Sequence, residues 1–333
     1  MMKLKTLKLE ELKSSTFSED TINTDIIAFD SLINQNLEKG SIIELVAESG
    51  MGKSTIACQI CCNICSKGGK VLYIDAEGKL SIDLIKSIGL DQYIDDNFFY
   101  IRKSAFNEVE EVLDMFISTE KINYVVIDSI ASLVHEGFVS LNKDTTNSEK
   151  KCLSITTNNS NYNSKRLTMF FNKYNSLAKK YGITFIMTNQ FRNIPDIIKS
   201  TIIKEYGPKC VRYYASSIIN ILPLSSTGVN KNFKKINKTS IGCDLVFEVS
   251  KSNKTYPGRK IPFYFIYGKG VSNVYSIMYA LIELGYIKEN NSYYTYEKDG
   301  IKKVYHGINE LVNDQELFNN SMNIAYDFYS KLW

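Results

Sequence analysis

From Asp25 onward, short apolar runs alternate with longer stretches whose apolar positions recur every three or four residues. The runs predict strands and the periodic stretches predict helices. We expect strands at 41–46, 70–75, 98–101, 124–128 and 184–188, and helices at 53–67, 81–89, 106–118 and 165–181. Because the runs are apolar throughout, they predict an α/β fold, with a mostly parallel sheet flanked by helices and ligands bound at the carboxyl ends of its strands.

Two segments interrupt this alternation. Residues 135–164 are rich in Asn, Ser, Thr and Lys without any periodicity, which predicts a long loop. Residues 192–212 are basic and apolar together, which is unusual for a surface connection. Beyond them, runs at 216–222, 243–249 and 262–267 predict an antiparallel extension of the sheet.

The last part of the chain has a different, aromatic-rich composition. Helices are expected at 272–284 and 308–319 around a hairpin at 293–305. We therefore predict three regions, which are a short N-terminal arm with an amphipathic helix at 4–12, a core, and a small C-terminal α+β domain. We place them at 1–24, 25–269 and 270–333.

The composition is that of a globular protein, with 44% hydrophobic and 23% charged residues in a chain of 333. The net charge of +4 is too small to indicate nucleic-acid binding by itself. No apolar run reaches the length of a membrane span, and seven cysteines agree with a reducing compartment, so we expect a cytoplasmic protein without a membrane partner. Four cysteines share one face of the 53–67 helix, which favours packing over metal binding: Cys58, Cys61, Cys62 and Cys65.

The segment AESGMGKST lies between the first strand and the first long helix, where a phosphate-binding P-loop is expected. Its glycines allow main-chain N–H groups to turn toward a phosphate, and the following helix adds the positive end of its dipole. Lys53 supplies a cation for the outer phosphates of ATP, and the Ser54 hydroxyl is a ligand for Mg²⁺. The expected nucleotide contacts in this segment are Glu48, Ser49, Gly50, Met51, Gly52, Lys53, Ser54 and Thr55.

Polar residues follow three more strands. Asp128 ends a strand in the Walker B arrangement, whose carboxylate holds Mg²⁺ through water. Glu77 follows the 70–75 strand and could orient and deprotonate the water that attacks the γ-phosphate. Asn189 and Gln190 follow the fifth strand, where amides could sense that phosphate.

Together these segments resemble a RecA-family homologous recombinase over nearly the whole chain. YIDAEGKLS resembles the family's strand with the catalytic glutamate, which implies that role for Glu77. VVIDSIASL resembles its Walker B segment, which implies Asp128, and TNQFR resembles its asparagine–glutamine switch.

Further likenesses imply partners. The span 192–212 has the length of the family's second DNA loop, and its isoleucines could wedge between bases. KSNKTYP resembles the segment that reaches a neighbour's ATP across a filament interface, which implies Lys254 and Lys251, and YGKGVSN implies Tyr267 as the residue that stacks on adenine. The cations expected to contact DNA phosphates are Arg192, Lys199, Lys204, Lys209 and Arg212.

Several positions depart from the family pattern. Ser81 stands where the family has an aspartate near the adenine, and Leu84 where it has an aromatic residue, which weakens the implied selectivity for adenine. The loop expected at 135–164 is longer than usual. These departures are those of a phage-encoded or otherwise divergent member.

The leading functional prediction is a DNA-dependent ATPase that forms helical filaments on single-stranded DNA and pairs it with homologous double-stranded DNA. Mediator or single-strand-binding proteins would be further partners. One alternative is a paralogue that regulates a recombinase filament without exchanging strands itself, which the intact Lys53, Glu77 and Asp128 argue against. A second is a hexameric helicase motor, which would be expected to carry an additional domain.

Overall fold

The computed structural model describes residues 22–33, 37–119, 122–134, 148–194, 202–205, 209–224, 242–290 and 293–331. Within these ranges, the side chains of 148–162, 192–194 and 202–205 are not described. None of the helices in the described ranges is both long enough and apolar enough to span a bilayer.

The described strands form a ten-stranded sheet and a separate three-stranded sheet. The centre of the large sheet is parallel, and its strands run in the order β7-β1-β5-β4-β2-β3. These strands are β1 (Ile42–Ala47), β2 (Val71–Asp75), β3 (Phe98–Ile101), β4 (Tyr124–Asp128), β5 (Thr184–Ile194) and β7 (Ser217–Pro223). Strands β1, β2 and β4 are buried along their whole length, as continuous apolar runs require.

Antiparallel strands extend the sheet beyond β7. They are β8 (Gly242–Ser252), β9 (Lys260–Ile266) and the short β10 (Gly270–Val271). A further strand, β6 (Ile202–Glu205), pairs antiparallel with the end of β5, so β5 continues six residues past the predicted Thr188. The predicted antiparallel extension is confirmed for the runs at 243–249 and 262–267, but the run at 216–222 is β7, which pairs parallel with β1. Part of the 192–212 segment is a β ladder.

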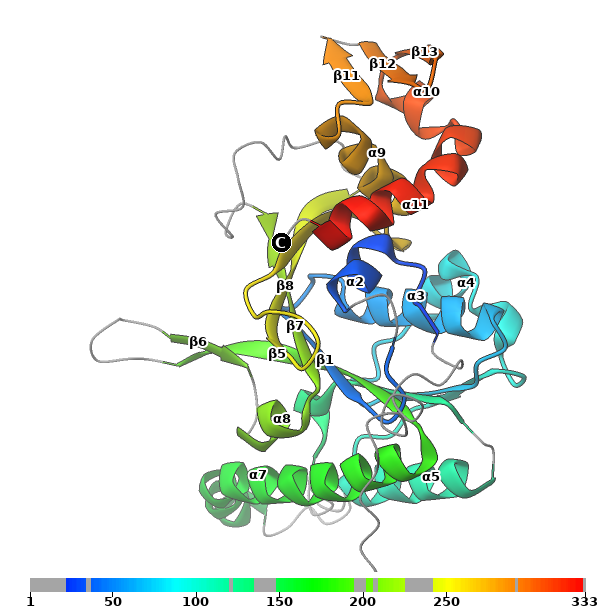
Figure 1. Ribbon diagram of the computed structural model, residues 1–333. Helices are drawn as coiled ribbons and strands as arrows, with labels where there is room; N and C mark the ends of the chain where they lie inside the picture. The colour runs from blue at the N-terminus through cyan, green and yellow to red at the C-terminus, as the bar shows by residue number, and fades with distance from the viewer. Residues whose placement is uncertain are drawn as a thin grey trace, which may run out of the picture.

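Helices cover both faces of the sheet (Figure 1). One face packs against α2 (Ile27–Leu32), α3 (Lys53–Ser66) and α4 (Ile82–Ile88), and the other against α5 (Phe106–Thr119) and α7 (Ser148–Tyr181). The face of α3 that carries cysteines is buried at Cys58, Cys61 and Cys65. Burial raises the pKa of the Cys58 and Cys65 thiols to about 12, so they remain protonated packing groups at neutral pH.

The three-stranded sheet lies at one end of the molecule (Figure 1). It consists of β11 (Ile287–Asn290), β12 (Tyr293–Lys298) and β13 (Ile301–His306) and is accompanied by α9 (Asn273–Glu283), α10 (Ile308–Val312) and α11 (Gln315–Lys331). Helix α11 returns to the core, where the Tyr326 hydroxyl donates to Asp30 of α2 at 3.2 Å and the Arg259 guanidinium donates to the Tyr329 carbonyl at 2.7 Å. The region boundaries at 24 and 270 remain predictions.

Two sequence expectations about helices differ from the structure, and a third is not tested by it. Helix α7 begins at Ser148, so half of the loop predicted at 135–164 is helical; its polar sequence lacks the apolar spacing that would have revealed a helix, and 135–147 lie outside the described residues. The helix predicted at 308–319 is two helices, because the Asp314 carboxylate accepts from the Leu317 N–H at 2.9 Å and caps a new start. The helix predicted at 4–12 lies outside the described residues.

Candidate functional site

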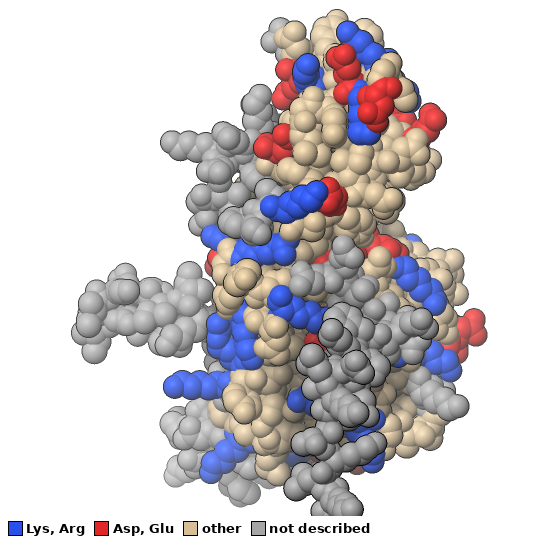
Figure 2. Space-filling view, viewed as in Figure 1, with Lys and Arg blue, Asp and Glu red and all other residues tan. Residues whose placement is uncertain are grey.

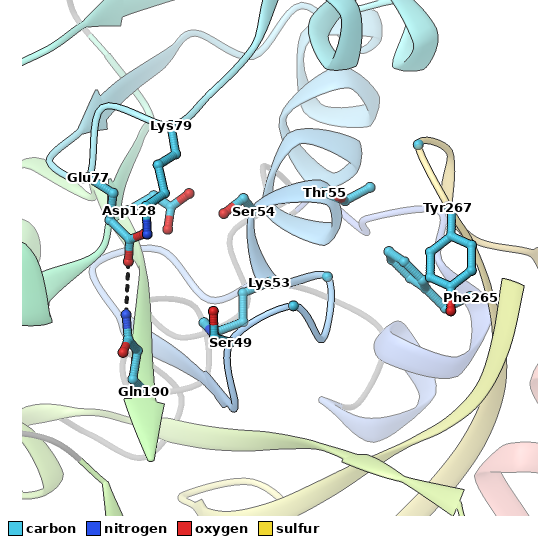
Figure 3. Close-up of a pocket in the computed structure, with 13 residues that line it drawn as sticks. Ser49, Lys53, Ser54, Thr55, Glu77, Lys79, Asp128, Gln190, Phe265 and Tyr267 are labelled. Carbon is cyan, nitrogen blue, oxygen red and sulfur yellow. Dashed lines mark hydrogen bonds and ion pairs between the residues drawn. The ribbon is translucent and has the colours of Figure 1, made fainter. Parts of the chain in front are cut away.

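A cavity of about 280 Å³ opens at the carboxyl ends of β1, β2, β4 and β5. It lies where the alternating pattern predicted a ligand site. Figure 3 shows Glu77, Lys79 and Asp128 on one side of Lys53 and Ser54, with Phe265 and Tyr267 on the other. The described residues that line it are Ser49, Gly50, Gly52, Lys53, Ser54, Thr55, Glu77, Lys79, Asp128, Gln190, Phe265, Tyr267 and Gly268.

The predicted P-loop joins β1 to α3 in a tight turn. Gly50 and Gly52 have φ values of +82° and +80°, a conformation that side chains disfavour. A Cβ at Gly52 would also lie only 2.4 Å from the Phe265 ring, so glycine is required there on two grounds. Gly52 is the N-cap of α3 and provides no side-chain hydrogen bond, which leaves the first N–H groups of this 14-residue helix suited to an anion.

Lys53 is buried at the start of α3. Its ammonium donates to the main-chain carbonyls of Ala47 and Glu48, both at 2.9 Å. Burial lowers the pKa of this ammonium, and the nearby carboxylates of Asp128 and Glu77 oppose the shift. Glu48 thus contributes through its carbonyl, whereas the Met51 side chain packs against the hydrophobic core, and neither is among the described residues that line the cavity.

The Asp128 carboxylate is held by hydroxyl groups of the two neighbouring strands. Tyr73 of β2 donates to one oxygen at 2.7 Å, and Thr188 of β5 donates to the other. Because both donors are buried, they fix the carboxylate in one orientation facing Ser54 across the cavity. A fixed carboxylate beside a hydroxyl is an oxygen donor set that fits Mg²⁺, which takes few protein ligands and keeps several waters.

The Glu77 carboxylate has three side-chain partners. Its Oε1 accepts from the Ser129 hydroxyl at 2.9 Å and from the Gln190 amide at 3.0 Å, and its Oε2 pairs with the Lys79 ammonium at 2.9 Å. Burial alone would raise the pKa of Glu77, but the bonds from Lys79, Ser129 and Gln190 outweigh it and lower that pKa. The carboxylate is therefore ionised at neutral pH and held in place.

Two other polar residues at the strand ends do not face the cavity. The Asp75 carboxylate organises the turn after β2, where it accepts from the main-chain N–H groups of Gly78 at 2.7 Å and Leu80 at 3.1 Å. Asn189 is fully buried, and its amide donates to Glu44 of β1. Of the predicted amide pair, Gln190 alone reaches Glu77, because alternate residues of a strand point to opposite faces.

Tyr267 lines the opposite end of the cavity, where the resemblance implied a base-stacking residue. The residue is 56% exposed, and its ring lies edge-on to Phe265, with 6.0 Å between ring centroids. Helix α4 contacts the turn that follows Tyr267, where the Ser87 hydroxyl donates to the Gly268 carbonyl at 2.6 Å. Ser81 is the N-cap of α4 and accepts from the Leu84 N–H at 3.2 Å, so its hydroxyl serves the helix.

The two lysines implied for a neighbour's nucleotide are not among the described residues that line the cavity. The Lys251 ammonium caps the C-terminal end of α8 (Lys209–Tyr214), where it donates to the carbonyls of Arg212 at 2.8 Å and Ala215 at 2.6 Å. Lys254, in the turn between β8 and β9, lies 3.7 Å from Glu38 and is partly exposed.

The described cations among those predicted to bind DNA lie in the β5–β6 ladder and in α8. Arg192 and Lys204 are register partners in the β5–β6 ladder, and Lys199 lies outside the described residues. Lys209 is exposed at the start of α8, and the Arg212 guanidinium donates to the Ser250 carbonyl and hydroxyl, both at 3.0 Å. Lys and Arg side chains gather on the side of the molecule where α8 and the β8–β9 turn lie (Figure 2).

Comparison with known proteins is decisive for the family. The family described as the RecA N-terminal domain matches residues 3–272. The chain belongs to the RecA family. A RecA protein of Nocardia farcinica is 25% identical over 279 residues, which cover 84% of this chain and 74% of that protein. One from Bifidobacterium breve is 23% identical over 296 residues, covering 89% and 70%, and one from a Mycobacterium species is 25% identical over 282, covering 83% and 74%.

Sequence reasoning missed several contributors to this RecA-family site, among them Thr188, which directly precedes Asn189 and donates to Asp128. Lys79 stands within the quoted YIDAEGKLS segment and could have been noticed as a cation two residues after Glu77. Ser129 directly follows Asp128. Tyr73 begins the same YIDAEGKLS segment, but its partner Asp128 lies on the neighbouring strand β4. Phe265 of β9 has no local signal, because it lies against Gly52 from a distant part of the chain.

Proposed function

We propose that this chain is a DNA-dependent ATPase that assembles as a helical filament on single-stranded DNA and catalyses homologous pairing and strand exchange. The observation that supports this most is the convergence of Lys53, Glu77, Asp128 and Gln190 on one cavity from four different elements. A cation that binds phosphate, a carboxylate that binds metal, a general base and an amide together suit the transfer of a phosphoryl group to water.

We assign the P-loop to the phosphates of ATP. The glycine turn and the first N–H groups of α3 would hold the inner phosphates, and the Lys53 ammonium would exchange its carbonyl partners for the outer ones. Ser54 and Asp128 would hold Mg²⁺, which, when bound, neutralises charge on the phosphate oxygens. Tyr267, beside the exposed end of the cavity, would stack on the base.

We assign Glu77 as the general base. Ser129 and Gln190 both bind its Oε1, so the carboxylate is oriented before substrate arrives and only its Oε2 needs to change partners. It would orient a water and accept its proton during attack on the γ-phosphate. Gln190 belongs to β5, which continues to Ile194 and pairs with β6, so a continuous strand links the base to the segment proposed to bind DNA.

Single-stranded and double-stranded DNA are the proposed partners of the 192–212 segment. Its cations, Arg192, Lys199, Lys204, Lys209 and Arg212, would contact backbone phosphates. Filament assembly repeats one head-to-tail interface, in which Lys254, with Lys251, would face the nucleotide of the next subunit. We retain the arm at 1–24, the core at 25–269 and the small domain at 270–333 as the proposed regions.

A paralogue that regulates a filament without exchanging strands is the alternative. It would need neither the base nor the oriented Asp128, and the ordered geometry of both in this cavity therefore favours the active enzyme. The discriminating experiment measures ATP hydrolysis with and without single-stranded DNA, together with electron microscopy and strand exchange between a circular single strand and a homologous duplex.

We expect single-stranded DNA to stimulate hydrolysis, helical filaments to form with ATP, and joint molecules to appear. Stimulated hydrolysis and filaments without joint molecules would favour the regulatory paralogue. Absence of ATP hydrolysis under every condition would contradict the proposed enzyme.

A further inference from the structure

The cavity contains a second ammonium group, that of Lys79, to which the roles above assign no chemistry. Its Nζ lies 2.9 Å from Glu77 Oε2, and its side chain is 74% exposed. The ion pair with Glu77 raises the pKa of Lys79, so it is charged at neutral pH. Unlike Lys53, which is buried against main-chain carbonyls, Lys79 reaches the cavity from the solvent side.

The main chain that carries Lys79 is held by hydrogen bonds, whereas its side chain is exposed. The Asp75 carboxylate accepts from the N–H groups of Gly78 and Leu80 on either side of it. The Arg102 guanidinium lies against Gly78, where a Cβ would meet it at 2.3 Å. A change of partner by the Lys79 ammonium therefore requires only rotation of a long, exposed side chain, which occurs on the order of picoseconds to nanoseconds.

The charges in the cavity favour a change of partner by the Lys79 ammonium when a nucleotide binds. Among the described lining residues, the ammonium groups of Lys53 and Lys79 balance the carboxylates of Glu77 and Asp128. A nucleoside triphosphate brings more negative charge than one carboxylate carries, and a terminal phosphate beside Glu77 would compete with it for Lys79. A diphosphate lacks the group that would compete.

We propose that Lys79 is a second phosphate-binding lysine, which neutralises Glu77 in the nucleotide-free site and transfers to the terminal phosphate of a bound nucleoside triphosphate. This inference rests on the proposed ATPase function. The transfer leaves Glu77 Oε1 held by Ser129 and Gln190 and frees Oε2 to accept a water. Lys79 therefore makes the site selective for triphosphate over diphosphate and couples occupancy of the terminal position to release of the base.

The test measures nucleotide binding in a Glu77→Gln background, because this variant removes the ion pair and slows hydrolysis, so that ATP itself can be used. Affinities for ATP and ADP with Mg²⁺ are measured by calorimetry on the wild type, E77Q, E77Q/K79M, E77Q/K79R and E77Q/K86M. Lys86 is an exposed lysine of α4 and serves as the matched control. We expect K79M to weaken ATP binding about tenfold and ADP binding by less than about twofold, the scale of one charge-assisted hydrogen bond.

The E77Q background distinguishes a role of Lys79 as the ion-pair partner of Glu77 from a role as a ligand of the terminal phosphate. If Lys79 were only the ion-pair partner of Glu77, K79M would change neither affinity in E77Q, and equal losses for ATP and ADP would likewise overturn the proposal. E77Q/K79R should recover most of the preference for ATP, and E77Q/K86M should match E77Q. If the wild type and E77Q bind neither nucleotide, the proposed ATPase function fails and this inference with it. If the wild type and E77Q bind ATP but E77Q/K79M keeps the same preference for ATP over ADP as E77Q, only the Lys79 assignment is overturned.

Discussion

The cavity and the basic region beside it use their charged side chains in different ways. In the cavity, side chains from separate strands bind one another, as when Tyr73 and Thr188 hold Asp128 and when Gln190 reaches Glu77. In the region formed by α8 and the β8–β9 turn, cations bind nearby main chain instead, as Lys251 does at the end of α8. The first arrangement is a preorganised site, and the second is a framework with exposed charges at its edge.

This difference separates the two lysines proposed to act on a neighbour's nucleotide. Lys251 would have to give up hydrogen bonds to the carbonyls of Arg212, Tyr213 and Ala215. The ion pair of Lys254 with Glu38 is long and partly exposed, so breaking that pair costs little. We therefore favour Lys254 for the role across the interface and Lys251 for holding α8.

The largest effect is expected from Lys53→Ala, which removes the buried cation of the phosphate cradle. Hydrolysis and ATP-dependent filament formation should be abolished, because α3 alone provides only partial charges for the phosphates. Hydrolysis and filament images are measured beside Lys86→Ala, which should behave like the wild type. Undiminished hydrolysis in K53A would contradict the P-loop assignment.

Glu77→Gln should slow hydrolysis about 10²-fold or more while ATP still binds, because the amide cannot accept a proton. Filaments should then persist on DNA with ATP. The matched control is Glu108→Gln, which breaks an exposed Glu–Lys ion pair of the same length, 2.9 Å, away from the cavity. Rapid release of DNA by E77Q in ATP would show that Glu77 is not the base.

Replacement of Arg192, Lys199 and Lys204 by Ala tests the basic region. Binding to single-stranded DNA should weaken, and the slope of log affinity against log salt should become shallower by ~0.7 for each DNA phosphate that the variant no longer neutralises. DNA-free nucleotide binding should remain. A triple replacement of the exposed Lys86, Lys180 and Lys331 measures the effect of removing three positive charges elsewhere on the surface. A slope that matches this control would mean that the segment does not touch the strand.

The smallest effect is expected from Tyr73→Phe, which removes one hydroxyl from Asp128. The Mg²⁺ concentration required for half-maximal ATP binding should rise by about threefold to tenfold, the scale of one hydrogen bond to a charged group. Tyr124→Phe removes a hydroxyl from a buried tyrosine at the opposite end of β4 from Asp128. If both variants have the wild-type requirement for Mg²⁺, Tyr73 does not position Asp128.

The sequence was most informative where local pattern and topology agree. The run predicted at 124–128 has the same bounds as β4. The rule that ligands bind at the carboxyl ends of parallel strands correctly predicted that Lys53, Glu77 and Gln190 lie in one site. Contacts between distant segments could not be foreseen, since Phe265 approaches Gly52 from 213 residues further along the chain. The direction of Asn189 also required the strand's register, which a pattern of residue types does not specify.

The most direct test of the central claim, that each nucleotide site is completed by the next subunit of a filament, mixes two inactive variants. K53A and Lys254→Ala should each fail to hydrolyse ATP on DNA. In an equal mixture, random head-to-tail assembly would create about a quarter of interfaces with an intact P-loop facing an intact Lys254. Electron microscopy of the mixture confirms co-assembly. We predict that hydrolysis partly returns, and hydrolysis that stays at the level of the separate variants in mixed filaments would contradict a shared site.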